Sequence, residues 1–210
     1  YVPITQIYVP DCEADDVVAY VVKYVFKEKR CVIVSSDKDL YQLLSKKAIQ
    51  WSPGQKKYIT PKDLVKKFGI SATNFCTVRA FVGDKSDGID GVPRAGYASL
   101  TKRFPLLREN NFISVDDLVT DAVTQSQTKD LKLYNSMIDN AAIARRNWRL
   151  MFLDITNLSA TQIEKINFSL ENPAPVGNKL SLIKMLHREG VHNFNTDAFY
   201  ASLAACRWNK

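Results

Sequence analysis

The sequence predicts an α/β protein with a parallel sheet in its front half and a helical back half. Two observations predict the sheet: short apolar runs alternate with helical periodicity over the first 70 residues, and residues 31–34 are apolar at every position, as in buried parallel strands. The helical periodicity that continues from Ile113 onward predicts the second half. We therefore expect three segments: an α/β core over 1–70, two helices around a glycine-rich loop over 71–110, and a helical region over 111–210.

The front half is expected to alternate strands and helices. Residues 5–9 are predicted to form a short apolar strand, and a helix over 13–26 follows with Asp11 as its N-cap. Residues 31–34 form the next strand, and their unbroken apolar character predicts a strand covered on both faces. Residues 39–44 form a second helix, which completes an order typical of a parallel sheet.

The rest of the chain is expected to supply one hairpin and a series of helices. Residues 49–51 and 57–59 flank Ser-Pro-Gly-Gln, which is a hairpin signal. Thr60 and Pro61 favour the start of a helix that ends near Gly69. Further helices are expected over residues 73–82, 96–103, 115–123, 131–153, 160–167, 178–187 and 196–208, with 172–175 (Asn-Pro-Ala-Pro) as the clearest linker.

Composition excludes several classes of protein. No apolar run approaches the ~20 residues that cross a bilayer, so we expect no membrane span. The four cysteines have no paired spacing, and the two histidines lie near the C-terminus, away from every acidic cluster. The cysteine spacing and the small number of histidines exclude a disulfide framework and a Cys/His zinc site, and the position of the histidines argues against a Ser/His/Asp or Cys/His triad. Because free thiols suit a reducing compartment, we expect a cytoplasmic protein.

Positive charge is concentrated between Lys38 and Glu109. This segment holds 14 of the 29 lysines and arginines but only 6 of the 22 acidic residues. Such a segment is typical of proteins that bind nucleic acid, because each neutralised phosphate releases counterions. A lysine-rich face that only aids solubility is the alternative, and it is the better explanation for Lys46 and Lys47 alone.

Seven carboxylates form three short groups, each directly after an apolar segment. The groups are Glu13, Asp15 and Asp16; Asp37 and Asp39; and Asp84 and Asp87. Taken singly, each group has an ordinary explanation as a helix N-terminus, an N-cap or a turn. Brought together, like charges cost free energy unless a cation compensates them, and all-oxygen ligands favour Mg²⁺ or Mn²⁺. Two such ions ~3.5–4 Å apart clamp a phosphodiester and activate water, so the sequence predicts phosphodiester hydrolysis.

The loop over residues 83–96 joins two predicted helices and is rich in Gly and Asp. Gly91-Val92-Pro93 predicts a tight turn, and Gly96 allows the backbone to approach a partner closely. The next helix presents its N-terminal N–H groups, which suit a phosphate, and it carries Lys102 and Arg103. A packing turn between two helices is the alternative, but the density of Gly and Asp favours a binding loop.

Three motifs, in this order, resemble the structure-specific 5′ nucleases: Glu13-Ala14-Asp15-Asp16, Ser36-Asp37-Lys38-Asp39 and the loop from Gly83 to Pro93. That family includes the flap endonucleases and the 5′-exonuclease domains of bacterial DNA polymerase I. Residues 49–57 resemble most the branch of T-even-type phage enzymes called ribonuclease H, which have this fold. The resemblance covers residues 11–104 well and the helical remainder loosely. The three ordered motifs are specific, whereas the first alone is weak.

The resemblance implies a PIN-like α/β nuclease domain, a helix–three-turn–helix that grips duplex DNA, and a helical C-terminal region. It also implies a 5′-to-3′ exonuclease or flap endonuclease that acts on flapped DNA or RNA–DNA hybrids during replication. Position by position, the carboxylates of the first motif serve the ion that activates water, Asp37 and Asp39 bridge to or hold the second ion, and Asp84 and Asp87 complete the second site. The DNA-binding residues are expected to be Lys85, Gly91, Val92, Arg94, Gly96, Lys102 and Arg103, in a turn where the family also holds K⁺.

The family carries an N-terminal strand with a metal-ligand Asp, and a basic arch, before the Glu13 motif. These are not among the 210 residues, so we expect them upstream in a longer protein. The alternative is a non-catalytic DNA-binding portion or subunit of such a nuclease. A PIN ribonuclease for single-stranded RNA is disfavoured, because those domains usually lack the glycine-rich loop and the helical extension. The resemblance is compatible with a monomer that contacts a single-strand-binding protein or a sliding clamp, although no motif identifies a partner.

Overall fold

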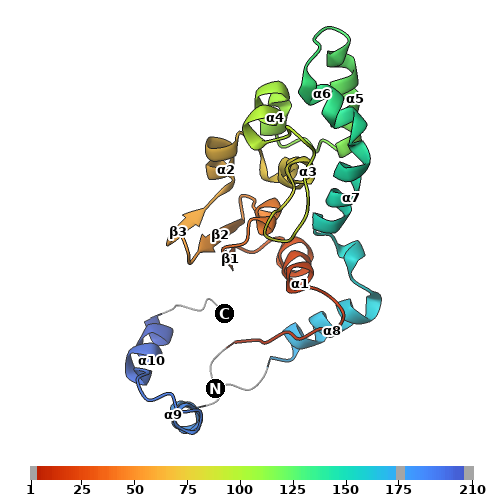
Figure 1. The fold of residues 1–210 in the computed structure, drawn as a ribbon. Helices are drawn as coiled ribbons and strands as arrows, with labels where there is room; N and C mark the ends of the chain where they lie inside the picture. Colours follow the sequence, from red (N-terminus) through yellow and green to blue (C-terminus); the bar gives the residue numbers. More distant parts are fainter. Residues whose placement is uncertain (1–3, 174–177, 206–210) are drawn as a thin grey trace. The chain divides into compact units, whose positions relative to one another are not determined.

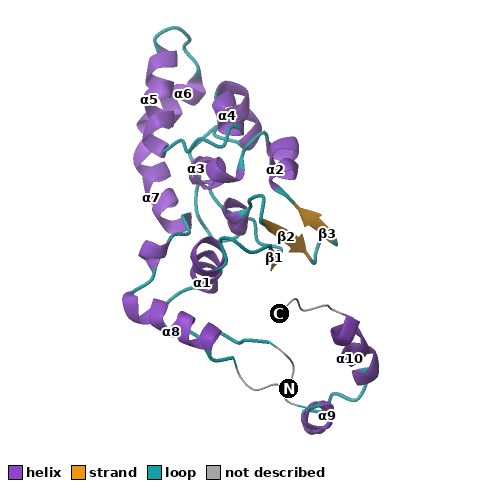
Figure 2. Cartoon of the chain, turned by 180° about the vertical axis from the view of Figure 1, so that it is seen from behind, coloured by secondary structure: helices purple, strands orange, loops and turns teal. Residues whose placement is uncertain are grey.

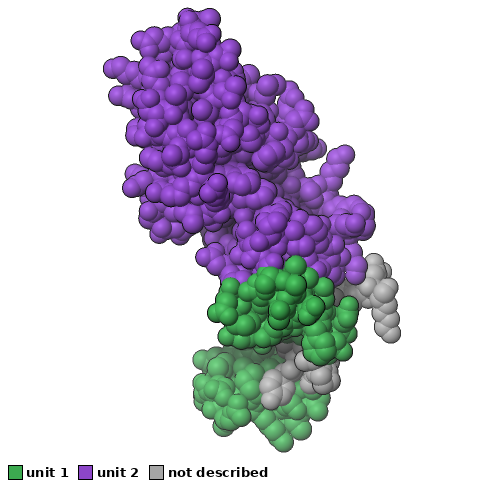
Figure 3. Space-filling view, turned by 90° about the vertical axis from the view of Figure 1, so that its right-hand side faces the viewer, with its two compact units in different colours: residues 1–11, 159–210 green, residues 12–158 purple. Residues whose placement is uncertain are grey.

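A computed structural model describes residues 4–173 and 178–205 of the chain (Figure 1). The chain divides into two compact units, which Figure 3 distinguishes by colour. The larger unit is Cys12–Leu158, and the smaller unit combines Tyr1–Asp11 with Ser159–Lys210. Residues 174–175 of the predicted linker and residues 206–208 of the last predicted helix lie outside the described residues.

The larger unit contains a three-stranded mixed sheet in the order β1-β2-β3. β1 (Cys31–Val34) and β2 (Ala48–Ser52) run parallel, with Cys31 opposite Ala48 and Val34 opposite Trp51. β3 (Lys57–Ile59) pairs antiparallel with β2, which confirms the predicted hairpin. The predicted α/β class is therefore confirmed, with a small mixed sheet in place of a purely parallel one.

The prediction that β1 is covered on both faces is wrong. Ile33 is buried, whereas Val32 and Val34 are 52% and 67% exposed. Successive side chains of a strand point to opposite faces, and among the described residues only the Ile33 face is packed, against Ala19 and Leu40. An unbroken apolar run does not by itself show that both faces have a neighbour.

The predicted strand over residues 5–9 is also wrong. No described strand lies beside these residues to accept and donate the backbone hydrogen bonds that a strand requires. They belong to the smaller unit with α8 (Ala160–Glu171), where the Gln162 amide donates to the carbonyls of Pro10 and Asp11 at 3.0 and 3.1 Å.

α3 (Ala72–Val82) is the central helix of the larger unit. Nine of its eleven residues are buried, as expected of a helix that is apolar on nearly all sides. It packs against α7 (Ala141–Met151), which lies beside it in Figure 2. It also packs against η2 (Asp39–Leu43), a short 3₁₀-helix that follows β1. Ser71 is the N-cap of the helix, and its hydroxyl accepts the Asn74 N–H at 3.3 Å; Gly83 is the C-cap.

The helix predicted over 13–26 is present as α1 (Ala14–Tyr20) continued by η1 (Val21–Val25), a π-helical turn. The single helix predicted over 131–153 is wrong, because the chain breaks at Asn140. The Asn140 side chain donates to the Ser136 carbonyl at 2.8 Å and so competes with the helical hydrogen bonds.

The other helices are α2 (Pro61–Phe68), α4 (Tyr97–Arg103), η3 (Pro105–Arg108), α5 (Val115–Ser126), α6 (Lys132–Asp139), η4 (Ile155–Asn157), α9 (Lys179–Arg188) and α10 (Thr196–Ala205). None of the helices in the described ranges has the length and apolar character needed to span a bilayer.

Candidate metal centre

Asp37 and Asp39 lie where the chain leaves β1 and enters η2. The Ser35 hydroxyl accepts the Asp37 N–H at 3.0 Å, and the Asp37 carboxylate accepts the Asp39 N–H at 2.8 Å. These hydrogen bonds, each between residues two positions apart, stabilise a turn at the carboxyl end of the parallel strand β1. Ligand sites of open α/β sheets lie outside this edge, so the turn places both acids where the sequence predicted a site.

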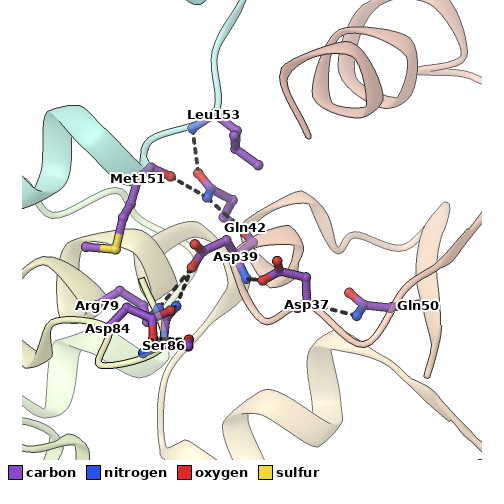
Figure 4. Close-up of polar contacts among 9 residues, drawn as sticks. All are labelled: Asp37, Asp39, Gln42, Gln50, Arg79, Asp84, Ser86, Met151 and Leu153. Carbon is purple, nitrogen blue, oxygen red and sulfur yellow. Dashed lines mark hydrogen bonds and ion pairs between the residues drawn. The ribbon is translucent and has the colours of Figure 1, made fainter. Parts of the chain in front are cut away.

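Two glutamines that the motifs do not mark hold this turn in place (Figure 4). The buried Gln50 of β2 donates to the backbone carbonyls of Ser35 and Asp37, both at 2.8 Å. Gln42 of η2 donates to the Met151 carbonyl at 2.9 Å and accepts the Leu153 N–H at 3.0 Å. The acidic turn is therefore fixed from the sheet on one side and from the end of α7 on the other.

Asp84 and Asp87 lie in the loop after α3, and two glycines allow this loop to fold closely onto the helix end. Gly83 has φ +79°, and a Cβ there would come within 2.4 Å of the Gly91 nitrogen. A Cβ on Gly91 would lie 2.1 Å from the Val82 carbonyl oxygen. No larger residue fits either position without moving the backbone, so these glycines position the acids by close packing.

Asp39, Asp84 and Asp87 form one group of carboxylates. One oxygen from each lies within 4.8 Å of the others, although Asp39 begins η2 and the other two lie in the loop after α3. A cavity of about 180 Å³ beside them is lined by Ser36, Asp37, Lys38, Arg79, Asp84 and Ser86. Three oxygen donors from carboxylates are a ligand set that suits Mg²⁺ or Mn²⁺, so the residues present fit a divalent ion.

Arg79 is the functional residue that the sequence motifs miss. Its Nε and Nη2 donate to Asp39 Oδ1 at 2.9 and 2.7 Å, and Nη2 also pairs with Asp84 Oδ2 (Figure 4). Burial by itself lowers the pKa of the guanidinium, but the Asp39 carboxylate raises that pKa above its ordinary value, so Arg79 stays charged. One signal in the sequence could have found it: Arg79 is the only charged residue of this largely buried helix.

The two acids that share Arg79 have opposite pKa shifts. Burial raises the pKa of the Asp39 carboxyl, and Arg79 offsets only part of that rise. Burial also acts on Asp84, but hydrogen bonds from the N–H and hydroxyl of Ser86, at 3.0 and 2.5 Å, and the charge of Arg79 together lower its pKa. Asp84 is thus the more firmly ionised member of the pair.

The α1 carboxylates are placed differently. Glu13 precedes α1, and Asp15 and Asp16 lie in its first turn. Burial, followed by the negative charges of Asp37, Asp39 and its α1 neighbours, raises the pKa of Asp15 to about 6. Asp16 instead accepts a hydrogen bond from the Asn157 amide at 2.7 Å. All three acids of this motif, and Asp37, are therefore outside the group of three carboxylates found among the described residues, although Asp15 is close enough to Asp37 and Asp39 for their charges to act on it.

The residues predicted to bind DNA lie in the same unit. Lys85, Arg94 and Lys102 are exposed, and Arg103 is half-buried. Val92 is buried in the core, where its N–H donates to the Phe81 carbonyl at 2.7 Å, and Gly91 is the close-packing glycine described above. Gly96 precedes α4, and the Ser99 hydroxyl accepts its N–H at 2.8 Å. Gly91 and Val92 thus shape the loop, and the basic side chains are the ones available to a partner.

Comparison with known proteins identifies relatives among nucleases. Residues 1–69 match the family described as "5'-3' exonuclease, N-terminal resolvase-like domain". A 5'-3' exonuclease of Halalkalibacterium halodurans is 36% identical over 110 residues, which are 50% of this chain and 35% of that protein. Flap endonuclease Xni of Shewanella halifaxensis is 29% identical over 163 residues, which are 74% of this chain and 60% of that protein. The chain thus spans between about a third and three fifths of the length of these two relatives.

Solved structures agree on the fold. A T5 5'-exonuclease mutant matches with a TM-score of 0.62 and 20% identity, over 76% of this chain and 66% of that one. A structure of T5 5'-exonuclease with divalent zinc ions bound matches with a TM-score of 0.61 and 20% identity, over 76% and 58%. The resolvase-like, PIN-type fold expected from the motifs is therefore confirmed. With the family match over residues 1–69 and the nuclease relatives, the resemblance is confirmed as well: residues 1–69 are similar to the N-terminal resolvase-like domain of 5'-3' exonucleases, and longer stretches of the chain are similar to a 5'-3' exonuclease and a flap endonuclease.

Proposed function

We propose that this chain acts in a divalent-metal-dependent 5′-to-3′ exonuclease or flap endonuclease that removes flaps and primers during replication. The observation that supports this most directly is the group of Asp39, Asp84 and Asp87, whose oxygens lie within 4.8 Å of one another beside a cavity of about 180 Å³. The nuclease relatives give the reaction class. We propose flapped duplex DNA and RNA–DNA hybrids as substrates.

Each group of acids has a proposed task. Bound Mg²⁺ or Mn²⁺ would polarise a phosphoryl oxygen and lower the pKa of a water molecule. Asp84 and Asp87 would hold one ion, and Asp37 and Asp39 would bridge to or share it. Asp15, with Glu13 and Asp16, would serve the ion that activates water. The raised pKa of Asp15 supports this task, because a carboxylate beside uncompensated negative charge gains from a cation.

Basic residues of the same unit would hold the phosphate backbone. Lys38 lines the cavity beside the acids, and a second, larger concavity of about 370 Å³ is lined by Lys57, Lys66 and Lys67. Together with Lys85, Arg94, Lys102 and Arg103, these side chains supply positive charge that attracts nucleic acid. K⁺ binding in the 83–96 loop, a monomeric state, a cytoplasmic location and contacts with a single-strand-binding protein or sliding clamp remain predictions from the resemblance.

The test is cleavage of a 5′-labelled flap duplex in Mg²⁺, with binding to the same duplex measured in Ca²⁺. Asp84→Asn is expected to abolish cleavage and to leave binding within about threefold of the unchanged chain. Asp116→Asn is the matched control, because Asp116 is an exposed acid that pairs with the exposed Arg145 at 2.7 Å. A chain that neither binds nor cleaves the duplex would contradict the proposal.

A second candidate is a DNA-binding portion of such a nuclease that needs further residues for cleavage. The observation in its favour is length, because the chain spans only 35% and 60% of the two relatives described. This candidate predicts binding in Ca²⁺ without cleavage in Mg²⁺. Cleavage lost in Asp84→Asn and kept in Asp116→Asn would exclude it.

A further inference from the structure

Arg79 supplies a positive charge directly beside the carboxylate group. It is only 5% exposed, at the C-terminal end of the central helix α3. Its guanidinium binds Asp39 Oδ1 through two nitrogens and Asp84 Oδ2 through one. The chain has therefore placed a permanent positive charge between two of the three acids that could hold a divalent ion.

The pairing leaves ligand atoms for an ion. Arg79 uses one oxygen of Asp39 and one of Asp84, so Asp39 Oδ2 takes no part in these bonds, and no ion pair of the described residues includes Asp87. The three carboxylates carry three negative charges, and Arg79 reduces the sum to two. A divalent ion at this group thus meets less negative charge, and it also lies close to a like charge that cannot be lost by deprotonation.

We propose that Arg79 is a resident counter-ion of the Asp39–Asp84–Asp87 group, which keeps the acids together when no metal is bound and weakens their affinity for a divalent ion. The inference rests on the proposed metal-dependent function, because it concerns the same carboxylates. In this view Arg79 is a positioning residue. The folded centre does not require a bound ion, and the group holds its ion loosely.

The test compares two variants that both retain a hydrogen-bond donor but differ in charge. Arg79→Gln removes the charge, and Arg79→Lys keeps it. Binding of Mn²⁺ alone is measured by titration calorimetry, and thermal unfolding is measured in EDTA and in Mn²⁺. We expect Arg79→Gln to bind Mn²⁺ at least tenfold more tightly, to unfold at a lower temperature in EDTA, and to gain more in melting temperature from Mn²⁺. Arg79→Lys is expected to bind Mn²⁺ within threefold of the unchanged chain.

A structural control separates this role from general destabilisation. Asn74 is a fully buried polar residue on the same helix, and its side chain bonds Glu109, Asn111 and Ile113, away from the acids. Asn74→Ala should lower the melting temperature equally in EDTA and in Mn²⁺. If Arg79→Gln does not fold in EDTA, refolding on addition of Mn²⁺ supports the inference, and failure to refold in Mn²⁺ contradicts it.

The outcomes distinguish the inference from the proposed function. Mn²⁺ affinity that is equal or weaker in Arg79→Gln overturns the inference, and cleavage of the flap duplex by the unchanged chain then leaves the function standing. Mn²⁺ binding that is undetectable in every variant contradicts both. Mn²⁺ binding that appears only in Arg79→Gln supports the counter-ion role even where the unchanged chain does not cleave.

Discussion

The carboxylates of α1 and those around Arg79 belong to the same unit, but their negative charges are balanced in different ways. Asp39 and Asp84 share the Arg79 guanidinium, and Asp84 also receives two hydrogen bonds from Ser86. No ion pair of the described residues includes an α1 acid, and the pKa of Asp15 rises to about 6. An acidic group is thus stable at neutral pH where the chain supplies its own cation. Where the chain does not, a proton or a metal ion must reduce the repulsion.

The largest expected effect comes from removing the positive charge that Arg79 supplies to Asp39 and Asp84. Arg79→Met should lower the free energy of unfolding by about 3–5 kcal/mol in EDTA, because it leaves partly buried acids without their partner. Urea unfolding measures the loss. Arg145→Met is the control, since it removes an exposed pair with Asp116 that is worth about 0–1 kcal/mol. Equal losses in the two variants would show that the buried ion pairs of Arg79 contribute no more to stability than the exposed pair of Arg145.

The second effect disturbs the loop that carries Asp84 and Asp87. Gly91→Ala places a Cβ 2.1 Å from the Val82 carbonyl oxygen, so the backbone must move, and we expect a loss of at least about 2 kcal/mol. Gly96→Ala is the control, because its Cβ would meet only the Ser99 hydroxyl at 3.7 Å and its φ of −120° suits any residue. A Gly91→Ala chain as stable as Gly96→Ala would contradict the close packing of this loop.

The smallest expected effect concerns Asp15 of α1, whose negative charge no ion pair of the described residues balances. Asp15 has a raised pKa in the folded chain, so its ionisation destabilises the fold as pH rises from about 4 to about 6 and continues to do so above 6. Asp15→Asn should therefore stabilise the metal-free chain at pH 7.5, by up to about 1 kcal/mol after solvent screening of a half-exposed group. The gain should diminish as the pH falls from about 6 to about 4, and it should vanish below the ordinary pKa of 3.8, where the acid is protonated in both states. Thermal unfolding in EDTA across this range measures it, and a gain that is independent of pH would contradict the cause given.

Most elements of the larger unit could be predicted because local signals define them. The hairpin follows from Ser-Pro-Gly-Gln, and α2 follows from the Thr60 cap, Pro61 and the left-handed Gly69. The errors occur where a neighbour decides the outcome. Within the described ranges, residues 5–9 have no strand to pair with and one face of β1 is uncovered, and Asn140 divides a pattern that predicts one helix. The spacing of apolar residues along the sequence indicates which face of an element is apolar, but it does not indicate which element packs against that face.

By itself the sequence determined the three acidic motifs, the order in which they follow apolar segments, and hence the resemblance to 5′ nucleases. These are features of composition and spacing along the chain, so they need no knowledge of contacts. Only the tertiary structure decided which acids meet. Asp39 joins Asp84 and Asp87 because η2 packs against α3, and Asp16 bonds Asn157 instead. It also decided that Arg79, 40 positions from Asp39, lies between the acids. A buried charge requires a partner, but which partner it finds depends on packing between elements far apart in the sequence.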